Sequence, residues 1–201
     1  MTARYDVLAA VRAALGPDRP PRSARPAPER DARPGRDPAA LVDLFAERVA
    51  DYRATVTRCR RPGLEAAVVA ALGDAGSVLV PDGLYLDVPR SVADGELTTL
   101  GLDGVAAVVT TATLGIAETG TIVLTHGPGQ GRRAVSLLPD HHVCVVGVDQ
   151  VVADVPQAVA LLDPARPQTW ISGPSATSDI ELSRVEGVHG PRRLDVVVVE
   201  D

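Results

Sequence analysis

The first fifteen residues carry apolar side chains at the three- and four-residue spacing of an amphipathic helix. These side chains are Val7, Leu8, Val11 and Leu15. A Gly-Pro pair follows directly, and such a pair ends a helix because glycine is conformationally free and proline lacks a backbone N–H. The pattern therefore predicts an N-terminal helix within residues 1–15.

Residues 16–38 show no apolar period and contain seven prolines. Such a segment favours an extended or unstructured linker, because it has too little apolar surface to bury. The ordinary interpretation is a spacer; the alternative is that it frees the first helix to dock on a partner. A second helix is expected to begin near Asp37-Pro38, because proline suits a first helical turn. Its apolar face would consist of Leu41, Leu44, Phe45 and Val49.

From residue 55 onward, short apolar runs of strand type alternate with helical segments. Strands are expected at 55–59, 77–80, 105–110, 135–138, 142–148, 169–172 and 194–199, and helices at 64–72 and 155–162. The last run is almost continuous valine, which is typical of a strand buried on both faces. This alternation predicts an α/β fold with a mainly parallel sheet that is covered on both faces.

The middle of the chain departs from that alternation. Two strand-like runs, 114–117 and 121–124, are separated by little more than Glu118-Thr119-Gly120. So short a connection joins antiparallel strands, and its glycine supplies a backbone angle that other residues avoid. The sequence therefore predicts a β-hairpin inserted into the α/β domain.

Composition removes several classes of chemistry. The chain has no lysine, which excludes Schiff-base catalysis, a P-loop lysine and a lysine general base. Residues 1–40 hold 8 Arg and 5 acidic residues, whereas residues 41–201 hold 12 Arg and 21 acidic residues. An acidic body with few aromatic residues is unsuited to nucleic acid, which requires cationic patches and stacking side chains. We therefore expect no nucleic-acid partner.

Cysteine, histidine and hydropathy favour a cytoplasmic protein without a metal centre. Cys59 and Cys144 are too few for a site of four thiolates, and Cys144 stands in an apolar run, as a small buried residue would. His141 and His142 are adjacent in a predicted strand, so they point to opposite faces and are poor partners for one metal ion. The N-terminal helix carries charge throughout, unlike a secretory signal, and no apolar run approaches the roughly 20 residues of a membrane span.

The densest group of polar side chains follows a predicted strand at Gly173-Pro174. A strand–turn–helix corner of this kind leaves backbone N–H groups unpaired, and these groups favour an anion. Hydroxyl and carboxylate side chains crowd the corner, namely Ser175, Thr177 and Asp179. Ser178 and Glu181 match a helix capping box, which explains those two residues structurally. A bound carboxylate or phosphate would need a nearby cation, for which the candidates are Arg184, Arg192 and Arg193.

Glu118 is the second candidate, because it is a carboxylate between two apolar runs. Partial burial would raise the pKa of its carboxyl group and suit it to act as a general base, a nucleophile or a polar clamp. The adjacent Thr119, Gly120 and Thr121 offer hydroxyl and backbone donors. The alternative is a turn residue that faces solvent and pairs with an arginine.

Two loops carry further candidates. His189 lies just before the last predicted strand, and histidine is the side chain best suited to proton transfer near neutral pH. A histidine that only bonds backbone is the alternative. The glycine-rich stretch 126–133 lacks the lysine and the spacing of nucleotide-binding loops. A mobile surface loop is therefore favoured over a phosphate clamp.

Four motifs together resemble the LUD-domain family, and within it the lactate utilization protein C type. They are Ala117-Glu-Thr-Gly-Thr121, Leu138-Pro-Asp-His-His142, Gly173-Pro-Ser-Ala-Thr-Ser-Asp-Ile-Glu181 and Gly187-Val-His-Gly-Pro191. They occur in the family's order, so residues 39–201 are expected to form a LUD domain. One departure is Ser178, where the family usually has alanine, and the capping box is therefore no general property of the family.

The resemblance implies a three-layer fold similar to the NagB/RpiA/CoA-transferase superfold. It also implies a role in the oxidation of L-lactate to pyruvate, together with two partner proteins. One partner carries iron–sulfur motifs, and the other carries both a LUD domain and iron–sulfur motifs. With two cysteines, this chain would be the component without a cluster, so we expect no cofactor on it and iron–sulfur clusters in its partners.

The candidate residues fall into two groups. Those considered for catalysis are Glu118, His189 and Asp179. Those considered for binding a small carboxylate or phosphate are Thr119, Gly120, Thr121, Gly173, Ser175, Thr177, Glu181 and Arg192.

Three functional hypotheses stay open at this point. In the first, a subunit of a lactate-oxidising complex binds a small carboxylate at the corner, with Glu118 and His189 facing it. In the second, the chain is an enzyme in its own right, either a sugar-phosphate isomerase or an acyl-CoA transferase with Glu118 as nucleophile. In the third, it is an assembly module in which residues 1–36 matter more than the pocket. The first requires the three polar segments to converge.

Overall fold

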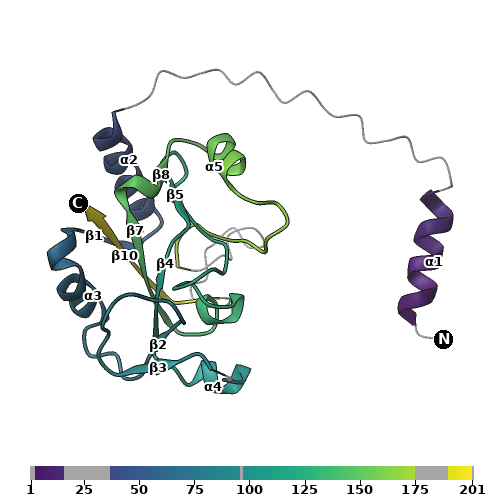
Figure 1. Cartoon of the computed structure of the whole chain (residues 1–201), viewed down its shortest axis with the longest axis horizontal. Coiled ribbons are helices and arrows are strands. Elements are labelled where there is room, and N and C mark those ends of the chain that lie inside the picture. The colour runs from purple at the N-terminus through teal and green to yellow at the C-terminus, as the bar shows by residue number, and fades with distance from the viewer. Residues whose placement is uncertain (1–2, 16–36, 96, 175–189, 201) are drawn as a thin grey trace. The chain divides into compact units, whose positions relative to one another are not determined.

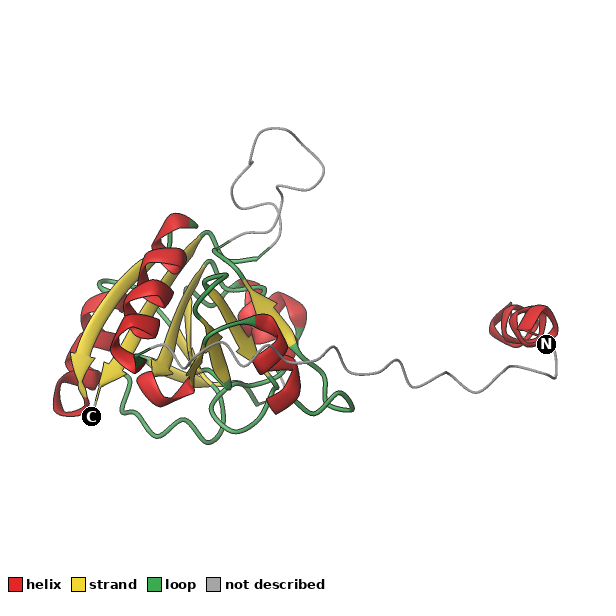
Figure 2. Ribbon diagram, turned by 90° about the horizontal axis from the view of Figure 1, so that it is seen from above, coloured by secondary structure: helices red, strands yellow, loops and turns green. Residues whose placement is uncertain are grey.

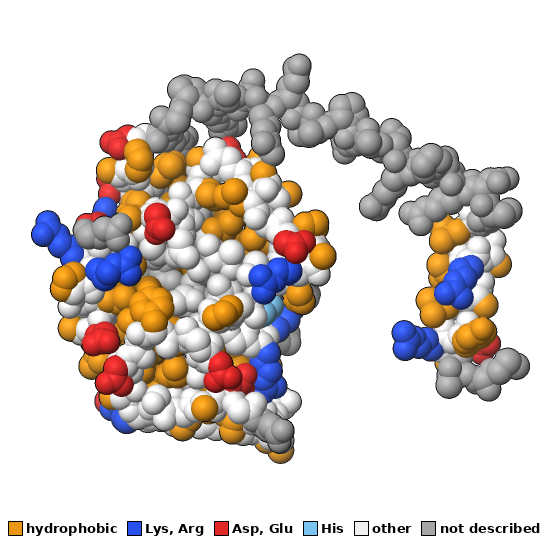
Figure 3. Space-filling view, in the orientation of Figure 1, with side chains coloured by type: hydrophobic (Ala, Val, Ile, Leu, Met, Phe, Trp, Pro, Cys, Tyr) orange, Lys and Arg blue, Asp and Glu red, His pale blue; other side chains and the backbone are white. Residues whose placement is uncertain are grey.

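The computed structural model describes residues 3–15, 37–95, 97–174 and 190–200. The chain divides into two units, Met1–Gly35 and Arg36–Asp201. In the first unit, α1 runs from Ala3 to Leu15. All of its side chains are exposed, including Tyr5 and the apolar residues of its predicted face. Figure 3 shows apolar side chains on the surface of this helix. No helix within the described ranges is both long and apolar enough to cross a membrane.

The second unit is built on a six-stranded sheet with the order β1-β10-β7-β4-β2-β3 (Figure 1). Its strands are β1 (Thr55–Arg60), β2 (Val78–Val80), β3 (Ser91–Ala93), β4 (Ala107–Thr111), β7 (His141–Gly147) and β10 (Arg193–Glu200). Every neighbouring pair is parallel. Strand β10 is buried from Leu194 to Val199, because a parallel strand inside a sheet is covered on both faces. The predicted α/β fold with a mainly parallel sheet is confirmed.

One face of this sheet is covered by α3 (Leu64–Leu72). Its buried residues Leu64, Val68 and Leu72 recur every four positions and form one helical stripe. The stripe packs on the residues of β7 and β10 that point to the same face, namely Val143, Val145, Val197 and Val199. The helix ends at Gly73, which takes a φ of +57°.

The other face meets a second sheet with the order β8-β5-β6-β9. Its strands are β5 (Leu114–Ile116), β6 (Thr121–Leu124), β8 (Val151–Val152) and β9 (Thr169–Ile171). Strands β5 and β6 form the predicted antiparallel hairpin. The hairpin is more than an insertion, however, because β8 pairs with β5 and β9 pairs with β6.

Helix α2 (Pro38–Asp51) contributes to the core between the two sheets. Asp37 caps it by accepting a hydrogen bond from the Ala39 N–H at 3.2 Å, which leaves proline at the first helical position. Its buried residues are Val42, Phe45 and Val49. They pack with the inward side chains of both sheets, among them Ile122, Leu124, Cys144, Val146, Val196 and Val198.

Helix α5 (Val155–Leu161) covers the outer side of the second sheet. Alternation along β6 explains this arrangement, since Val123 points to α5 while Ile122 and Leu124 point to the inner core. The layers are therefore α3, the parallel sheet, the second sheet with α2, and α5 (Figure 2).

The strand expected at 135–138 is wrong, because Arg133–Ser136 forms a 3-10 helix. Its turns close with hydrogen bonds from the Val135 N–H to the Arg132 carbonyl and from the Leu137 N–H to the Ala134 carbonyl. Only Val135 anchors this segment fully in the core. The helix α4 (Thr99–Asp103) and the strands β3 and β8 were not anticipated. Two further 3-10 helices cover Arg61–Gly63 and Val148–Gln150.

Candidate functional site

Two of the three predicted polar segments lie side by side. Strand β6 pairs with β9 through Ile122 and Ile171, so the hairpin turn comes next to the residues that precede Gly173. A chain of hydroxyl groups joins them: Thr119 Oγ1 lies 2.7 Å from Thr121 Oγ1, and Thr121 Oγ1 lies 2.8 Å from Ser172 Oγ. The hydroxyls of Thr119 and Thr121 are therefore hydrogen-bonded at this junction.

The described end of the third polar segment, Gly190-Pro191, lies at the same junction. A Cβ on Gly190 would lie 3.5 Å from the Pro174 carbonyl oxygen. Gly190 and Pro191 also line the same cavity as Gly173 and Pro174. The described parts of all three segments thus converge. The predicted residues outside the described ranges are Ser175, Thr177, Ser178, Asp179, Glu181, Arg184 and His189.

The cavity at this junction has a volume of ≈ 230 Å³, which is somewhat below the roughly 300–1,000 Å³ of most small-molecule sites and restricts it to a small ligand. Arg133 and Ser136 approach it from the 3-10 helix, and His142 approaches it from β7. His142 is 1% exposed. Burial lowers the pKa of His142 to about 4, and His141 acts in the same direction. The cavity therefore joins a buried neutral imidazole to a cationic side chain.

Arg133 lines the cavity and carries a positive charge there. For a bound anion, the sequence instead predicts a cation among Arg184, Arg192 and Arg193. The Arg133 side chain is exposed, and within the described part of the chain its guanidinium makes no hydrogen bond or ion pair. Arg192 instead faces Asp140 at 3.5 Å, with both side chains more than half exposed. Arg193 binds Asp195 on the opposite face of the sheet, because side chains alternate along β10.

Glu118 lies at the apex of the hairpin turn and is exposed. The expectation that its carboxylate is partly desolvated is therefore wrong. The turn buries the flanking Ala117 and Gly120 instead, and the backbone N–H of Glu118 donates to the Ala153 carbonyl at 3.0 Å. Glu118 does not line the cavity, and a catalytic role for it stays a prediction.

Two glycines at this junction rest on the C-terminal end of α2. Gly120 has a φ of +58°, and a Cβ on it would lie 2.5 Å from the backbone carbon of Arg48. Gly173 has a φ of +85°, and a Cβ on it would lie 2.8 Å from Cβ of Tyr52. Both positions require glycine for its backbone angle and for space. The end of α2 thus fixes the hairpin turn and the Gly173 corner together.

We expect Gly120→Ala to lower the free energy of unfolding by about 2–4 kcal/mol, because it adds left-handed strain to a backbone clash. Urea denaturation followed by circular dichroism measures the loss. Gly95→Ala is the matched control, since Gly95 also has a positive φ but open space around it. That control should lose about 1 kcal/mol. Equal losses for the two variants would contradict the close packing on α2.

His141 and His142 point to opposite faces of the sheet, as predicted. His141 Nε2 lies 2.6 Å from Asp195 Oδ2 on the α3 face, whereas His142 Nε2 lies 2.8 Å from Thr110 Oγ1 on the other. Within the described ranges, no three His, Cys, Asp or Glu side chains are placed to hold a metal ion.

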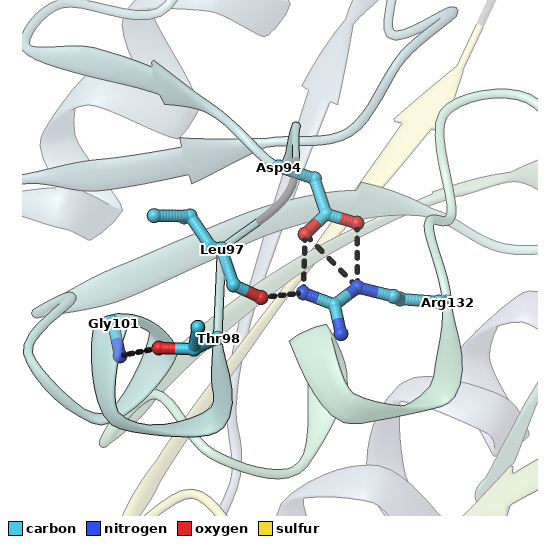
Figure 4. Close-up of polar contacts among 5 residues, drawn as sticks. All are labelled: Asp94, Leu97, Thr98, Gly101 and Arg132. Carbon is cyan, nitrogen blue, oxygen red and sulfur yellow. Dashed lines mark hydrogen bonds and ion pairs between the residues drawn. The ribbon is translucent and has the colours of Figure 1, made fainter.

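The glycine-rich loop is anchored to the domain by hydrogen bonds, and its interpretation as a mobile surface loop stays a prediction. Gln130 is buried, and its Oε1 accepts a hydrogen bond from the Thr125 N–H at 2.7 Å. The Gly129 carbonyl accepts another from the Thr111 N–H at 2.9 Å. Arg132 forks onto the Asp94 carboxylate and also donates to the Leu97 carbonyl (Figure 4). A buried glutamine and a forked arginine hold the loop in place.

Comparison with known proteins assigns the family. Residues 94–199 match the model of the LUD domain. The chain is 48% identical to "Lactate utilization protein C" of Deinococcus radiodurans in an alignment of 170 positions that covers 80% of this chain and 80% of that relative. It is 34% identical to the protein of the same name from Shouchella clausii, over 57% of this chain and 50% of that relative. A crystal structure of a DUF162 family protein from Deinococcus radiodurans superposes with a TM-score of 0.71 at 40% identity, covering 83% of this chain and 100% of that one. On this evidence, the chain belongs to the LUD domain family.

Proposed function

We infer that this chain acts in lactate utilization, as the cluster-free component of an iron–sulfur system that oxidises L-lactate to pyruvate. The observation that carries this proposal is the 48% identity to a lactate utilization protein C over 80% of both chains. Two iron–sulfur proteins are its expected partners, and the cytoplasm is its expected compartment.

The two cysteines support a component without a cluster. Burial raises the pKa of the Cys144 thiol to about 12, although the hydrogen bond from Thr110 acts in the opposite direction. Burial and the nearby Glu200 raise the pKa of Cys59 as well. A cluster with four thiolate ligands would also need more cysteines than the two that the chain contains. Redox chemistry in such a system would belong to the partners.

The cavity supports a binding role in this component. It is small and joins the exposed Arg133 to the buried His142. A guanidinium binds a carboxylate through charge-assisted hydrogen bonds. The structure does not support the hypothesis of a stand-alone acyl-CoA transferase, because its proposed nucleophile, Glu118, is exposed and lies outside the cavity lining.

One observation favours the assembly module as a second function. Helix α1 exposes five large apolar side chains, namely Tyr5, Val7, Leu8, Val11 and Leu15. A helix with an uncovered apolar stripe is suited to lie in the groove of a partner. Assembly and ligand binding are compatible roles, and different parts of the chain would carry them.

The decisive experiment is lactate-dependent reduction of an artificial electron acceptor in extracts of the native cell, with and without this chain. We expect deletion to lower the rate at least about tenfold and purified full-length chain to restore it. An unchanged rate would refute the proposed function. If the chain binds ligand, Arg133→Gln lowers the rate while the partners still co-purify. If it only assembles the complex, deletion of residues 1–36 abolishes co-purification and Arg133→Gln has no effect.

A further inference from the structure

The two ring nitrogens of His142 have different surroundings. Nε2 lies 2.8 Å from Thr110 Oγ1 on the neighbouring strand β4. The Thr110 hydroxyl in turn donates to Cys144 Sγ at 3.6 Å. Nδ1 has no hydrogen-bond partner among the described residues. A ring this buried would ordinarily have both nitrogens satisfied, so the unpartnered Nδ1 points to a ligand.

One hydrogen bond fixes the orientation of the ring. A neutral imidazole carries one N–H donor and one bare acceptor nitrogen. Nε2 is paired with Thr110 Oγ1 on the neighbouring strand. Nδ1 is therefore the ring nitrogen that stays available for a hydrogen bond to a ligand in the cavity that His142 lines.

The cavity also contains a cation and an apolar wall. Arg133 begins the 3-10 helix, and the Ser136 hydroxyl donates back to the Arg133 carbonyl at 3.2 Å. That bond holds the single turn that carries the guanidinium. The apolar side chains on the lining include those of Leu137, Trp170, Ile171 and Leu194. A ligand that fits must be small, carry one negative charge and one group that can hydrogen-bond a ring nitrogen, and have an apolar remainder.

We propose that Arg133 and His142 form a two-point site for a small 2-hydroxycarboxylate, in which the Arg133 guanidinium binds the carboxylate and His142 Nδ1 forms a hydrogen bond with the 2-hydroxyl group. The choice of lactate as the probe rests on the proposed function. His142 is then the residue that determines specificity, because a site built around a hydroxyl rejects the analogue without it. Thr110 is a positioning residue, since its hydrogen bond with Nε2 orients the His142 ring.

Calorimetric titration of the full chain with L-lactate and with propionate, which lacks the hydroxyl, tests the site. The wild type should bind lactate about 3- to 10-fold more tightly than propionate, as expected for one hydrogen bond. Arg133→Gln should weaken both acids by about 10- to 100-fold, because each loses a charge-assisted pair. The matched control is Arg58→Gln, whose guanidinium pairs with Asp43 and Glu200 and does not line the cavity, and it should change neither affinity.

His142→Leu should lower lactate affinity to that of propionate and leave propionate binding unchanged. Thr110→Val keeps the volume of the side chain and releases Nε2, so it should also reduce the preference for lactate if His142→Leu fails to fold. In the wild type, ¹⁵N NMR should show the Nδ1 resonance of His142 shifting with lactate and not with propionate. No lactate binding, or a preference that survives both variants, would overturn the proposal.

The acceptor-reduction experiment separates this site from the proposed function. If lactate oxidation requires the chain but Arg133→Gln leaves both binding and rate unchanged, the site is wrong and the proposed function stands. If lactate oxidation does not require the chain, the proposed function is wrong, and the titration with lactate and propionate still decides the site.

Discussion

Replacing Phe45 with alanine should lower the free energy of unfolding by about 3–5 kcal/mol, the loss expected for removing a buried aromatic ring. Phe45 is the chain's single phenylalanine and is fully buried in the core that α2 shares with both sheets. Its ring lies over Gly115 in β5, where a Cβ would come within 2.9 Å of two ring carbons. The cavity left by alanine would therefore separate α2 from the second sheet.

A double-mutant cycle tests this packing more sharply. Gly115→Ala alone should cost about 1–3 kcal/mol, because its methyl group overlaps the Phe45 ring. With Phe45→Ala the same methyl group enters vacated space, so the double variant should be more stable than the sum of the two losses predicts. Gly63→Ala, which has nothing within 4 Å of its added methyl group, should combine additively with Phe45→Ala. Urea denaturation measures all of these variants, and additivity at Gly115 would contradict the described contact.

The second large effect is expected at Asp195, which is 3% exposed on the α3 face of the sheet. Its carboxylate accepts from His141 Nε2 at 2.6 Å and from Arg193 Nε at 2.7 Å. Asp195→Ala removes the common partner of two hydrogen-bond donors and leaves His141 buried without it. We expect a loss of about 2–4 kcal/mol, somewhat below that for a fully buried ion pair, because Arg193 is half exposed.

The pH dependence of this loss has a definite sign. Burial acts to raise the pKa of Asp195, but the hydrogen bonds from His141 and Arg193 outweigh it and hold the pKa below its ordinary value. The contribution is therefore complete above the unfolded pKa of about 3.9 and disappears as the pH falls through the lower folded value. The full difference between wild type and Asp195→Ala should therefore be present above about pH 4 and should shrink as the pH falls further, through the folded pKa of Asp195.

Asp140→Ala provides the control for both measurements. Asp140 pairs with Arg192 at 3.5 Å, but both side chains are about two-thirds exposed. Its loss should be about 0–1 kcal/mol. If Asp140→Ala and Asp195→Ala have the same stability at neutral pH, the buried cluster contributes less than its geometry implies.

Strands that are buried on both faces could be predicted from sequence, because a run such as 194–199 has no other way to bury so many β-branched side chains. The segment 135–138 looked similar but buries fully only Val135 and Ser136, and its local hydrogen bonds favour a turn. The second sheet was not predictable, because the pairing of β5 with β8 and of β6 with β9 joins segments that no local pattern connects.

The candidate site shows the same division between local and long-range information. The glycines at 120 and 173 could be identified locally, since tight turns require them. Arg133 and His142 were missed as site residues because one stood in an apparent surface loop and the other in a strand. The available signal was a histidine in an otherwise apolar strand, but its partner Thr110 lies 32 positions away.

The strand order also determines how much of the parallel sheet can form during translation. Strand β1 lies at the edge of the parallel sheet and pairs there with β10, the sixth of its strands in chain order. Strand β1 can therefore form its hydrogen bonds to β10 only after nearly the whole chain has been translated. Until then the exposed edge is open to mispairing with other chains. Chaperone protection during translation should matter most in this interval.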